Sequence, residues 1–328
     1  MNRAFRLIRR RLLGAIPVLL IVVVGTFFLL EAAEGDAVDA YLVSAGTTDT
    51  AQIEAMRQDW GLDQSALARL GLFFSSVVTG DLGFSVTFSR PVLDVVLERL
   101  PNTLLLMGGA TALSFFLGSV LGIVAGARPG GLRDRFLSIG SLALYAMPSF
   151  WLGLVLLVLF AVEWRWLPLG GIETIASGYT GIERALDIAR HLVLPVAALG
   201  IIYLALYLRM MRTGMAEAWR ADFVLALRAR GIPRRRIVLA HVARNALLPL
   251  ITMLGLQSAA MLGGSVVIES VFAIPGLGRL AQEAVAARDT PLLLGVILTS
   301  AVFVIIINLA VDIAYAALDP RVGASEAS

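Results

Sequence analysis

Residues 292–317 read LLLGVILTSAVFVIIINLAVDIAYAA, a run in which Asp312 is the single charged side chain. A helix advances about 1.5 Å per residue, so about 20 apolar residues are enough to cross the hydrocarbon core of a bilayer. This run exceeds that length. It therefore predicts a membrane-spanning helix rather than a segment of a soluble core.

Further blocks of the same kind precede it along the chain: Leu12–Leu30, Thr103–Ala127, Phe136–Val162, Leu192–Met211 and Ala246–Val271. The composition agrees, because 58% of the residues are hydrophobic and 16% are charged, against about 45–50% and about 25% in soluble domains. The first block is too long for the apolar region of a cleaved signal peptide. We therefore expect an all-α polytopic membrane protein with about six transmembrane helices and an uncleaved first span.

The distribution of arginine sets the expected orientation. All 27 Lys and Arg residues are arginine, and most of them fall in residues 1–11, in the second-to-third loop and in residues 212–245. Cytoplasmic loops carry an excess of positive charge, so we expect these segments and both termini to be cytoplasmic.

This orientation divides the chain into expected regions. They are a cytoplasmic N-terminus (1–11), a first transmembrane helix (12–30), an extracytoplasmic region with short helices (31–100), a core transmembrane domain of five helices (101–318) that includes the cytoplasmic loop 212–245, and a cytoplasmic tail (319–328).

Within the extracytoplasmic region, Asp63–Val78 has an amphipathic pattern. It fits either a helix on the membrane surface or a helix packed in a small extramembrane subdomain. Arg90 and Pro91 are expected to open another short helix, since proline is tolerated at the first helical positions. Pro101 is expected to mark the entry to the next span.

Signatures of covalent chemistry are missing from the sequence. It contains no HExxH, GxSxG or GxxxxGK[ST] motif and no cysteine. The two histidines, His191 and His241, are expected on opposite sides of the membrane, where they cannot share a metal ion. We therefore expect a chain that is not an enzyme and that binds no cofactor or metal of its own.

The loop between the fourth and fifth blocks contains DFVLALRARG, residues 222–231. Asp222 fits the N-cap of a helix, and Arg228 and Arg230 lie near its C-terminus, where the helix dipole favours cations. Gly231 suits the left-handed position after a helix, and Pro233 prevents its continuation. A short capped cytoplasmic helix is predicted, which by itself also fits an ordinary positively charged loop.

The surrounding stretch, ADFVLALRARGIPRRRIVLAHVARNALLP, resembles the cytoplasmic signature of bacterial ABC importer permeases, in the form found in the dipeptide/oligopeptide/nickel branch. Other segments resemble the same branch in the same order: QIEAMRQDWGLD, GDLGFS and RPVLDVVLERLPNTLLL between Gln52 and Leu106, SVVIESVFAIPGLGRLAQEAVAARDTPLLLG from Ser265 to Gly295, and NLAVDIAYAALDPRV from Asn308 to Val322. The resemblance covers nearly the whole chain. It departs from the branch at Glu34, Gln64, Ala226 and Leu227.

The resemblance implies a type I ABC importer permease fold in a bacterial inner membrane, with the short helix acting as the coupling helix that docks on an ATPase. The residues implied for docking are Asp222, Phe223, Ala226, Arg228, Ala229, Arg230 and Gly231. The implied partners are a second, homologous permease subunit in a pseudo-symmetric heterodimer, two ATP-binding subunits that use ATP and Mg, and an extracytoplasmic substrate-binding protein, with no nucleic acid. The implied substrates are dipeptides or oligopeptides, with nickel, another metal chelate or glutathione as alternatives.

Polar residues inside the spans are candidates for the translocation path, because ionisable and polar groups are costly in a membrane. The candidates are Gln257, Ser258, Glu269, Asn308 and Asp312. Two other interpretations stay open. Glu269 could be a helix-end charge that reaches interfacial water, and Asn308 and Asp312, which share a helix face, could form structural pairs.

A self-sufficient secondary transporter or channel is the alternative from another class. It would favour inverted repeats and broken helices near the middle of the membrane, and neither is evident in the sequence. It would also transport its substrate without ATP.

Overall fold

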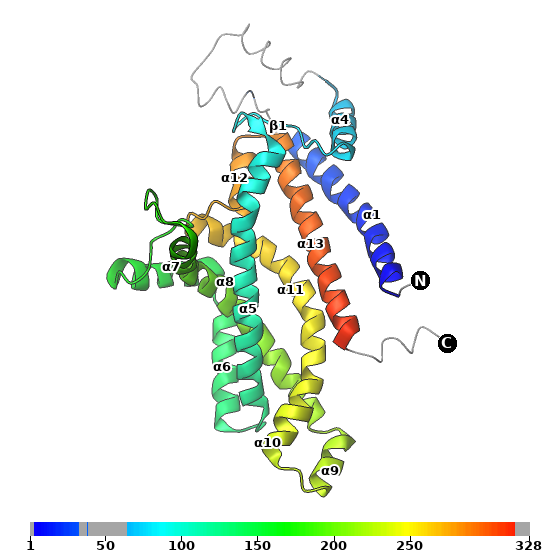
Figure 1. Ribbon diagram of the computed structural model, residues 1–328, viewed down its shortest axis with the longest axis vertical. Coiled ribbons are helices and arrows are strands. Elements are labelled where there is room, and N and C mark those ends of the chain that lie inside the picture. The colour runs from blue at the N-terminus through cyan, green and yellow to red at the C-terminus, as the bar shows by residue number, and fades with distance from the viewer. Residues whose placement is uncertain (1–2, 33–37, 39–63, 319–328) are drawn as a thin grey trace. The chain divides into compact units, whose positions relative to one another are not determined.

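The computed structural model describes residues 3–32, 38 and 64–318, which are mainly helical (Figure 1). The predictions for QIEAMRQDWGLD and for the C-terminal tail lie outside these residues. The elements are α1 (Arg3–Glu31), α4 (Ala66–Val78), β1 (Phe84–Ser85), β2 (Arg90–Pro91), α5 (Val92–Gly126), α6 (Leu132–Ala146), α7 (Ser149–Leu157), the π-helical η1 (Val158–Glu163), α8 (Gly181–Ala218), α9 (Asp222–Ala229), α10 (Arg234–Arg236), the π-helical η2 (Ile237–Val242), α11 (Ala243–Val271), α12 (Leu277–Ala286) and α13 (Thr290–Leu318).

The chain divides into two compact units. Unit 1 combines Met1–Thr103 with Pro275–Ile305, and unit 2 combines Leu104–Ile274 with Ile306–Ser328. In the described part of the chain, 5 helices are long and apolar enough to cross a membrane, and a sixth span is formed if a bent pair of helices counts as one. The single helices are α1, α5, α8, α13 and the continuous helix formed by α10, η2 and α11. Five of the six predicted spans are thereby found as single helices.

The third predicted span, Phe136–Val162, is not one straight helix. The chain bends by 97° between α6 and α7. Met147 and Pro148 adopt extended backbone angles at the bend. Proline has no N–H to donate and disfavours helical geometry in the residue before it, so the helix ends at Ala146. The expectation of unbroken spans is wrong here.

The bent pair nevertheless crosses from one end of unit 2 to the other. α6 begins beside the last turn of α5, where the Arg212 side chain of α8 binds Asp134. After α7 and η1, the Gly171 N–H donates to the carbonyl of Phe272, the C-cap of α11, at 2.8 Å. This contact lies at the end of unit 2 opposite to Arg212. Counting this pair as one crossing gives six, as the sequence predicts.

The helix that contains the second predicted span begins before Pro101. Arg90 and Pro91 form strand β2, which pairs antiparallel with β1, and α5 then runs without a break from Val92 through Pro101 to Gly126. Proline is tolerated inside membrane helices because neighbouring groups satisfy the backbone that it leaves unpaired. No separate short helix lies between β2 and the second span.

In unit 1, the buried carboxylate of Asp289 joins segments that are distant in the sequence. Ser85 Oγ donates to Asp289 Oδ2 at 2.6 Å, and the Thr87 N–H donates to the same oxygen at 3.0 Å. The Leu292 N–H donates to Oδ1 at 3.1 Å, which caps the first turn of α13. The motifs GDLGFS and ARDTPLLLG, separated in the sequence, therefore meet at one residue.

The amphipathic helix predicted over Asp63–Val78 is observed as α4. Its Leu70 and Phe73 pack in a cluster with Val23, Phe27 and Leu294. The middle of its apolar face is thereby covered by the chain itself, whereas Leu67 and Val78 are exposed.

In unit 2, three glycines of α5 allow α8 to approach closely. Gly118, Gly122 and Gly126 recur every four residues and so form one stripe along the helix. A Cβ at Gly122 would lie 2.5 Å from Met211 Cβ and 2.8 Å from the Leu208 carbonyl oxygen. Small residues spaced in this way let helix backbones pack at short range within membranes.

We predict that Gly122→Ala destabilises the chain by about 1–3 kcal/mol, because the added methyl group must displace the backbone of α8. Gly108→Ala is the matched control on the same helix, since a Cβ there meets nothing within 4 Å. Thermal unfolding in detergent, followed by tryptophan fluorescence, measures both variants. Equal midpoints for the two would contradict the close packing.

Candidate functional site

The loop between α8 and α11 contains the short helix predicted from the sequence. α9 runs from Asp222 to Ala229, and its N-cap is Ala221, which makes no side-chain capping bond. The prediction of Asp222 as N-cap is therefore wrong by one position. Asp222 lies instead in the first turn, where its negative charge is favoured by the helix dipole.

The C-terminus of α9 is closed by the geometry expected from its glycine. Gly231 has a φ of 70°, in the left-handed region. Its N–H donates to the Arg228 carbonyl at 2.9 Å, and the Ile232 N–H donates to the Leu227 carbonyl at 3.2 Å. This pair of bonds is a Schellman motif, and Pro233 follows it. The prediction of how this helix ends is confirmed.

One face of α9 is anchored and the other is open. Val224 is buried and packs in an apolar cluster with residues of α8, η2 and α11, joined by the half-buried Phe223 and Leu227. The opposite face exposes Leu225, which is 71% accessible, together with Ala226 and Ala229. Phe223, predicted as a docking residue, therefore packs against the cluster, and Leu225, which was not among the predicted docking residues, is exposed.

Residues on both sides of α9 hold the end of α5. The Trp219 indole donates through Nε1 to the Gly126 carbonyl at 2.9 Å, and Arg234 donates through Nη2 to the Ala127 carbonyl at 2.9 Å. The guanidinium carbons of Arg228 and Arg234 lie 5.3 Å and 5.2 Å from the centre of the Trp219 ring. We call this arrangement of Trp219, Arg228 and Arg234 the α9 clasp.

The α9 clasp has a clear physical basis. The last carbonyls of a helix lack partners within the helix, and they carry partial negative charge. An indole N–H and a guanidinium satisfy two of them at the end of α5. Stacking of the two guanidinium groups on Trp219 adds cation–π attraction. The segments before and after α9 are thereby fastened to a helix that is distant in the sequence.

An ion pair with a buried carboxylate fastens α6 to α8 at the same end of unit 2. Arg212 binds Asp134 through two contacts, Nε to Oδ1 at 2.5 Å and Nη2 to Oδ2 at 2.9 Å. The Gly130 N–H donates to Oδ2 at 2.8 Å, and Ser138 Oγ donates to Oδ1 at 3.2 Å. Asp134 is only 2% exposed, and both of its carboxylate oxygens accept hydrogen bonds from these partners. In the sequence, Arg212 could be read only as part of the loop's positive charge.

The five candidates for a translocation path do not form one cluster. Gln257, Ser258 and Glu269 lie on α11, whereas Asn308 and Asp312 lie on α13. Glu269 is roughly 16 Å along the helix from Ser258, given the rise per residue.

Their environments also differ. The Ser258 hydroxyl donates to the Leu254 carbonyl in its own helix at 2.7 Å. Asn308 packs against the surface of α11, where a Cβ on Gly255 would lie 2.9 Å from its Oδ1. Glu269 is 0% exposed, so the interpretation of a charge that reaches interfacial water is wrong. Gln257 and Asp312 are half-buried.

Residues 118–324 match the family described as binding-protein-dependent transport system inner membrane component, and residues 4–107 match its N-terminal family. The oligopeptide transport system permease protein AppB of Bacillus subtilis is 34% identical over 314 residues, which is 95% of this chain and 98% of that protein. The glutathione transport system permease protein GsiC of Pectobacterium atrosepticum is 36% identical over 313 residues, or 95% and 97% of the two chains.

Among solved structures, the inward-facing MetNI methionine ABC transporter matches with a TM-score of 0.53 and 18% identity, covering 69% of this chain and 97% of that chain. At this identity, the match shows the fold alone, which is that of a type I ABC importer permease. The fold and the family expected from the sequence motifs are confirmed. The chain therefore belongs to the multi-pass inner membrane components of binding-protein-dependent transport systems.

Proposed function

We propose that this chain is the membrane-spanning subunit of an ATP-driven importer of peptides, and that α9 is the element on which an ATP-hydrolysing subunit docks. The observation that carries the docking proposal is α9 itself. It is a short helix with a closed C-terminus, a buried anchor at Val224 and an exposed face at Leu225, Ala226 and Ala229. Arg228 and Arg230, at its end, add positive charge beside that face.

The contacts around α9 supply a route for mechanical coupling. α9 follows α8 directly in the chain, and the α9 clasp fastens the loop to α5. The Asp134–Arg212 pair extends the connection to α6. Beyond α10, the π-helical η2 leads into α11, and π-helical turns often mark functional positions. A displacement of α9 would therefore reach four helices of unit 2 as a rigid-body movement.

The proposed assembly follows from the family. A component of a binding-protein-dependent system works with a substrate-binding protein outside the membrane. We propose that the complex also contains a second, homologous permease subunit and two ATP-binding subunits, which bind the ATP and Mg. With six crossings both termini lie on one side, and the arginine distribution favours the cytoplasm for that side and for α9.

Peptides are the proposed substrate class because relatives that match along nearly their whole length carry peptide names. Glutathione, itself a small peptide, is the second candidate, since GsiC is as similar to this chain as the peptide permeases are. For the translocation path, we propose the half-buried Gln257 and Asp312. Asn308 is half-buried too, but it packs against Gly255 of α11. Ser258 and Asn308 are proposed to serve packing.

Reconstitution into proteoliposomes tests the proposed function. We expect uptake of a labelled peptide only when the whole complex, the binding protein and ATP are present, because the sequence contains no GxxxxGK[ST] motif for binding ATP. Uptake of the peptide by the purified chain alone, without ATP, would instead identify a secondary transporter or channel.

We predict that Gly231→Val uncouples the complex, because a β-branched residue in the left-handed region costs about 1–2 kcal/mol and disturbs the end of α9. Substrate-stimulated ATPase activity should fall several-fold while membrane insertion is unchanged. Gly231→Asn is the matched control, since asparagine tolerates this conformation. Normal stimulation in the valine variant would count against docking at α9.

The α9 clasp gives another prediction. Trp219→Phe keeps an aromatic ring but removes the N–H donor, and Arg234→Gln removes one guanidinium. Each should lower the amount of peptide transported per ATP hydrolysed, because α5 would no longer follow α9. Arg235→Gln, an exposed neighbour on α10, is the control for loss of charge. If all three variants transport equally well per ATP, the clasp has no coupling role.

A further inference from the structure

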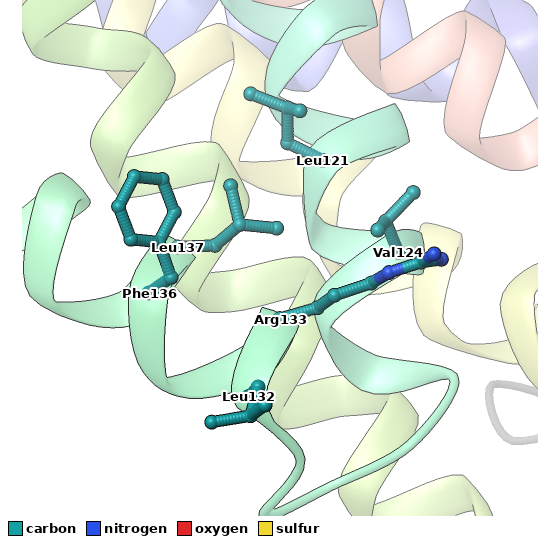
Figure 2. Close-up of a pocket in the computed structure, with 6 residues that line it drawn as sticks. All are labelled: Leu121, Val124, Leu132, Arg133, Phe136 and Leu137. Atoms are coloured by element: carbon teal, nitrogen blue, oxygen red, sulfur yellow. The ribbon is translucent and has the colours of Figure 1, made fainter.

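A groove lies between the last turns of α5 and the first turns of α6, apart from the contacts that hold α9. It has a volume of about 410 Å³ and is lined by Leu121, Val124, Leu132, Arg133, Phe136 and Leu137 (Figure 2). Volumes of small-molecule sites begin at about 300 Å³. All of the lining residues belong to unit 2, and all but Arg133 are apolar.

The apolar wall of the groove is open to the surroundings. Leu132 is 85% exposed and Phe136 is 78% exposed. One turn or so farther along the same faces, Val120 on α5 and Ile139 on α6 are also more than half exposed. The groove therefore continues as an apolar track along both helices, away from the end at which α9 lies.

The polar end of the groove is positively charged. Figure 2 shows the Arg133 side chain extending from α6 toward Val124 on α5. Arg128 and Arg135 are exposed nearby, and none of these three arginine side chains forms an ion pair with another described residue. The one acid of this turn, Asp134, is buried and bound to Arg212. Nothing in the described part of the chain therefore neutralises the charge at this end.

We propose that the groove binds an anionic glycerophospholipid from the leaflet on the α9 side of the membrane. Its phosphate would lie against Arg133, and an acyl chain would follow the apolar wall from Leu132 and Phe136 toward Ile139. A cationic pocket between membrane helices at the bilayer surface is the setting in which anionic headgroups are recognised. The groove has one cation, Arg133, near one end and apolar side chains beyond it. A phospholipid matches this arrangement, because its anionic phosphate lies at one end and its acyl chains extend away from it.

A second permease subunit is the other class of occupant. A protein surface that covered this groove would need acidic side chains opposite an exposed arginine, whereas a phosphate supplies that charge directly. The free cation thus favours the lipid, and a photo-crosslink can decide between the two.

The first test uses the assembled complex, released from nanodiscs that contain either phosphatidylglycerol or phosphatidylcholine, and native mass spectrometry of the bound lipid. We expect preferential retention of phosphatidylglycerol, and Arg133→Gln should reduce it about fivefold, the effect of about one interfacial arginine. Arg135→Gln is the matched control, because it removes the same charge from the same helix without lining the groove. Equal retention in the wild type and in Arg133→Gln would overturn the proposal.

The second test identifies the occupant directly. Phe136→benzoylphenylalanine places a photoreactive group in the wall of the groove, in the same nanodiscs. A mass adduct of one phospholipid on the peptide that contains residue 136 supports the lipid site. A crosslink to a protein subunit of the complex overturns it and identifies the groove as a protein interface. Neither result depends on whether α9 docks an ATPase, so the outcome is independent of the transport proposal.

Discussion

The close approach of α5 and α8 is the constraint on which the rest of unit 2 depends. At Gly118, Gly122 and Gly126, a side chain of any size would meet the atoms of α8. In a membrane there is little hydrophobic drive to bring helices together, so close van der Waals contact between backbones takes its place. Because the stripe extends to Gly126, α5 and α8 are still in contact at the end of α5. That contact places the terminal carbonyls of α5 within reach of the loop that follows α8.

The functional loop is therefore a consequence of helix packing as much as of its own sequence. Trp219 lies directly after α8, and it reaches the Gly126 carbonyl because α8 already lies against α5. Arg234 begins α10 and reaches the next carbonyl, that of Ala127. α9 lies between these two residues in the chain, so both of its ends are held to α5. At the same end of unit 2, Asp134 joins α6 to α8 through its ion pair with Arg212. Arg133, the preceding residue of α6, is exposed.

Local signals in the sequence predicted the spans and the short helix. They failed where the same residue type is compatible with two different backbone structures. Gly231 could be placed because a left-handed residue at the end of a helix requires little knowledge of the surroundings. The effect of proline could not be predicted in this way, because Pro101 lies inside the continuous helix α5, whereas Pro148 lies at the bend that interrupts the third span. Pairings such as that of Ser85 with Asp289, 204 residues apart, leave no periodic pattern in one sequence. The burial of Glu269 likewise depends on neighbours that only the fold brings together.

The strength of the α9 clasp decides whether it can transmit motion. Two hydrogen bonds, each contributing about 0.5–1.5 kcal/mol, and two cation–π contacts of about 0.5–1 kcal/mol each together amount to about 2–5 kcal/mol. That corresponds to a closed clasp favoured over an open one by a factor of about 30 to 5,000. α5 and α9 would then move together most of the time, since the open state is rarely populated. The contacts remain weak enough to break and reform, so the clasp couples the two helices without locking unit 2 into one conformation.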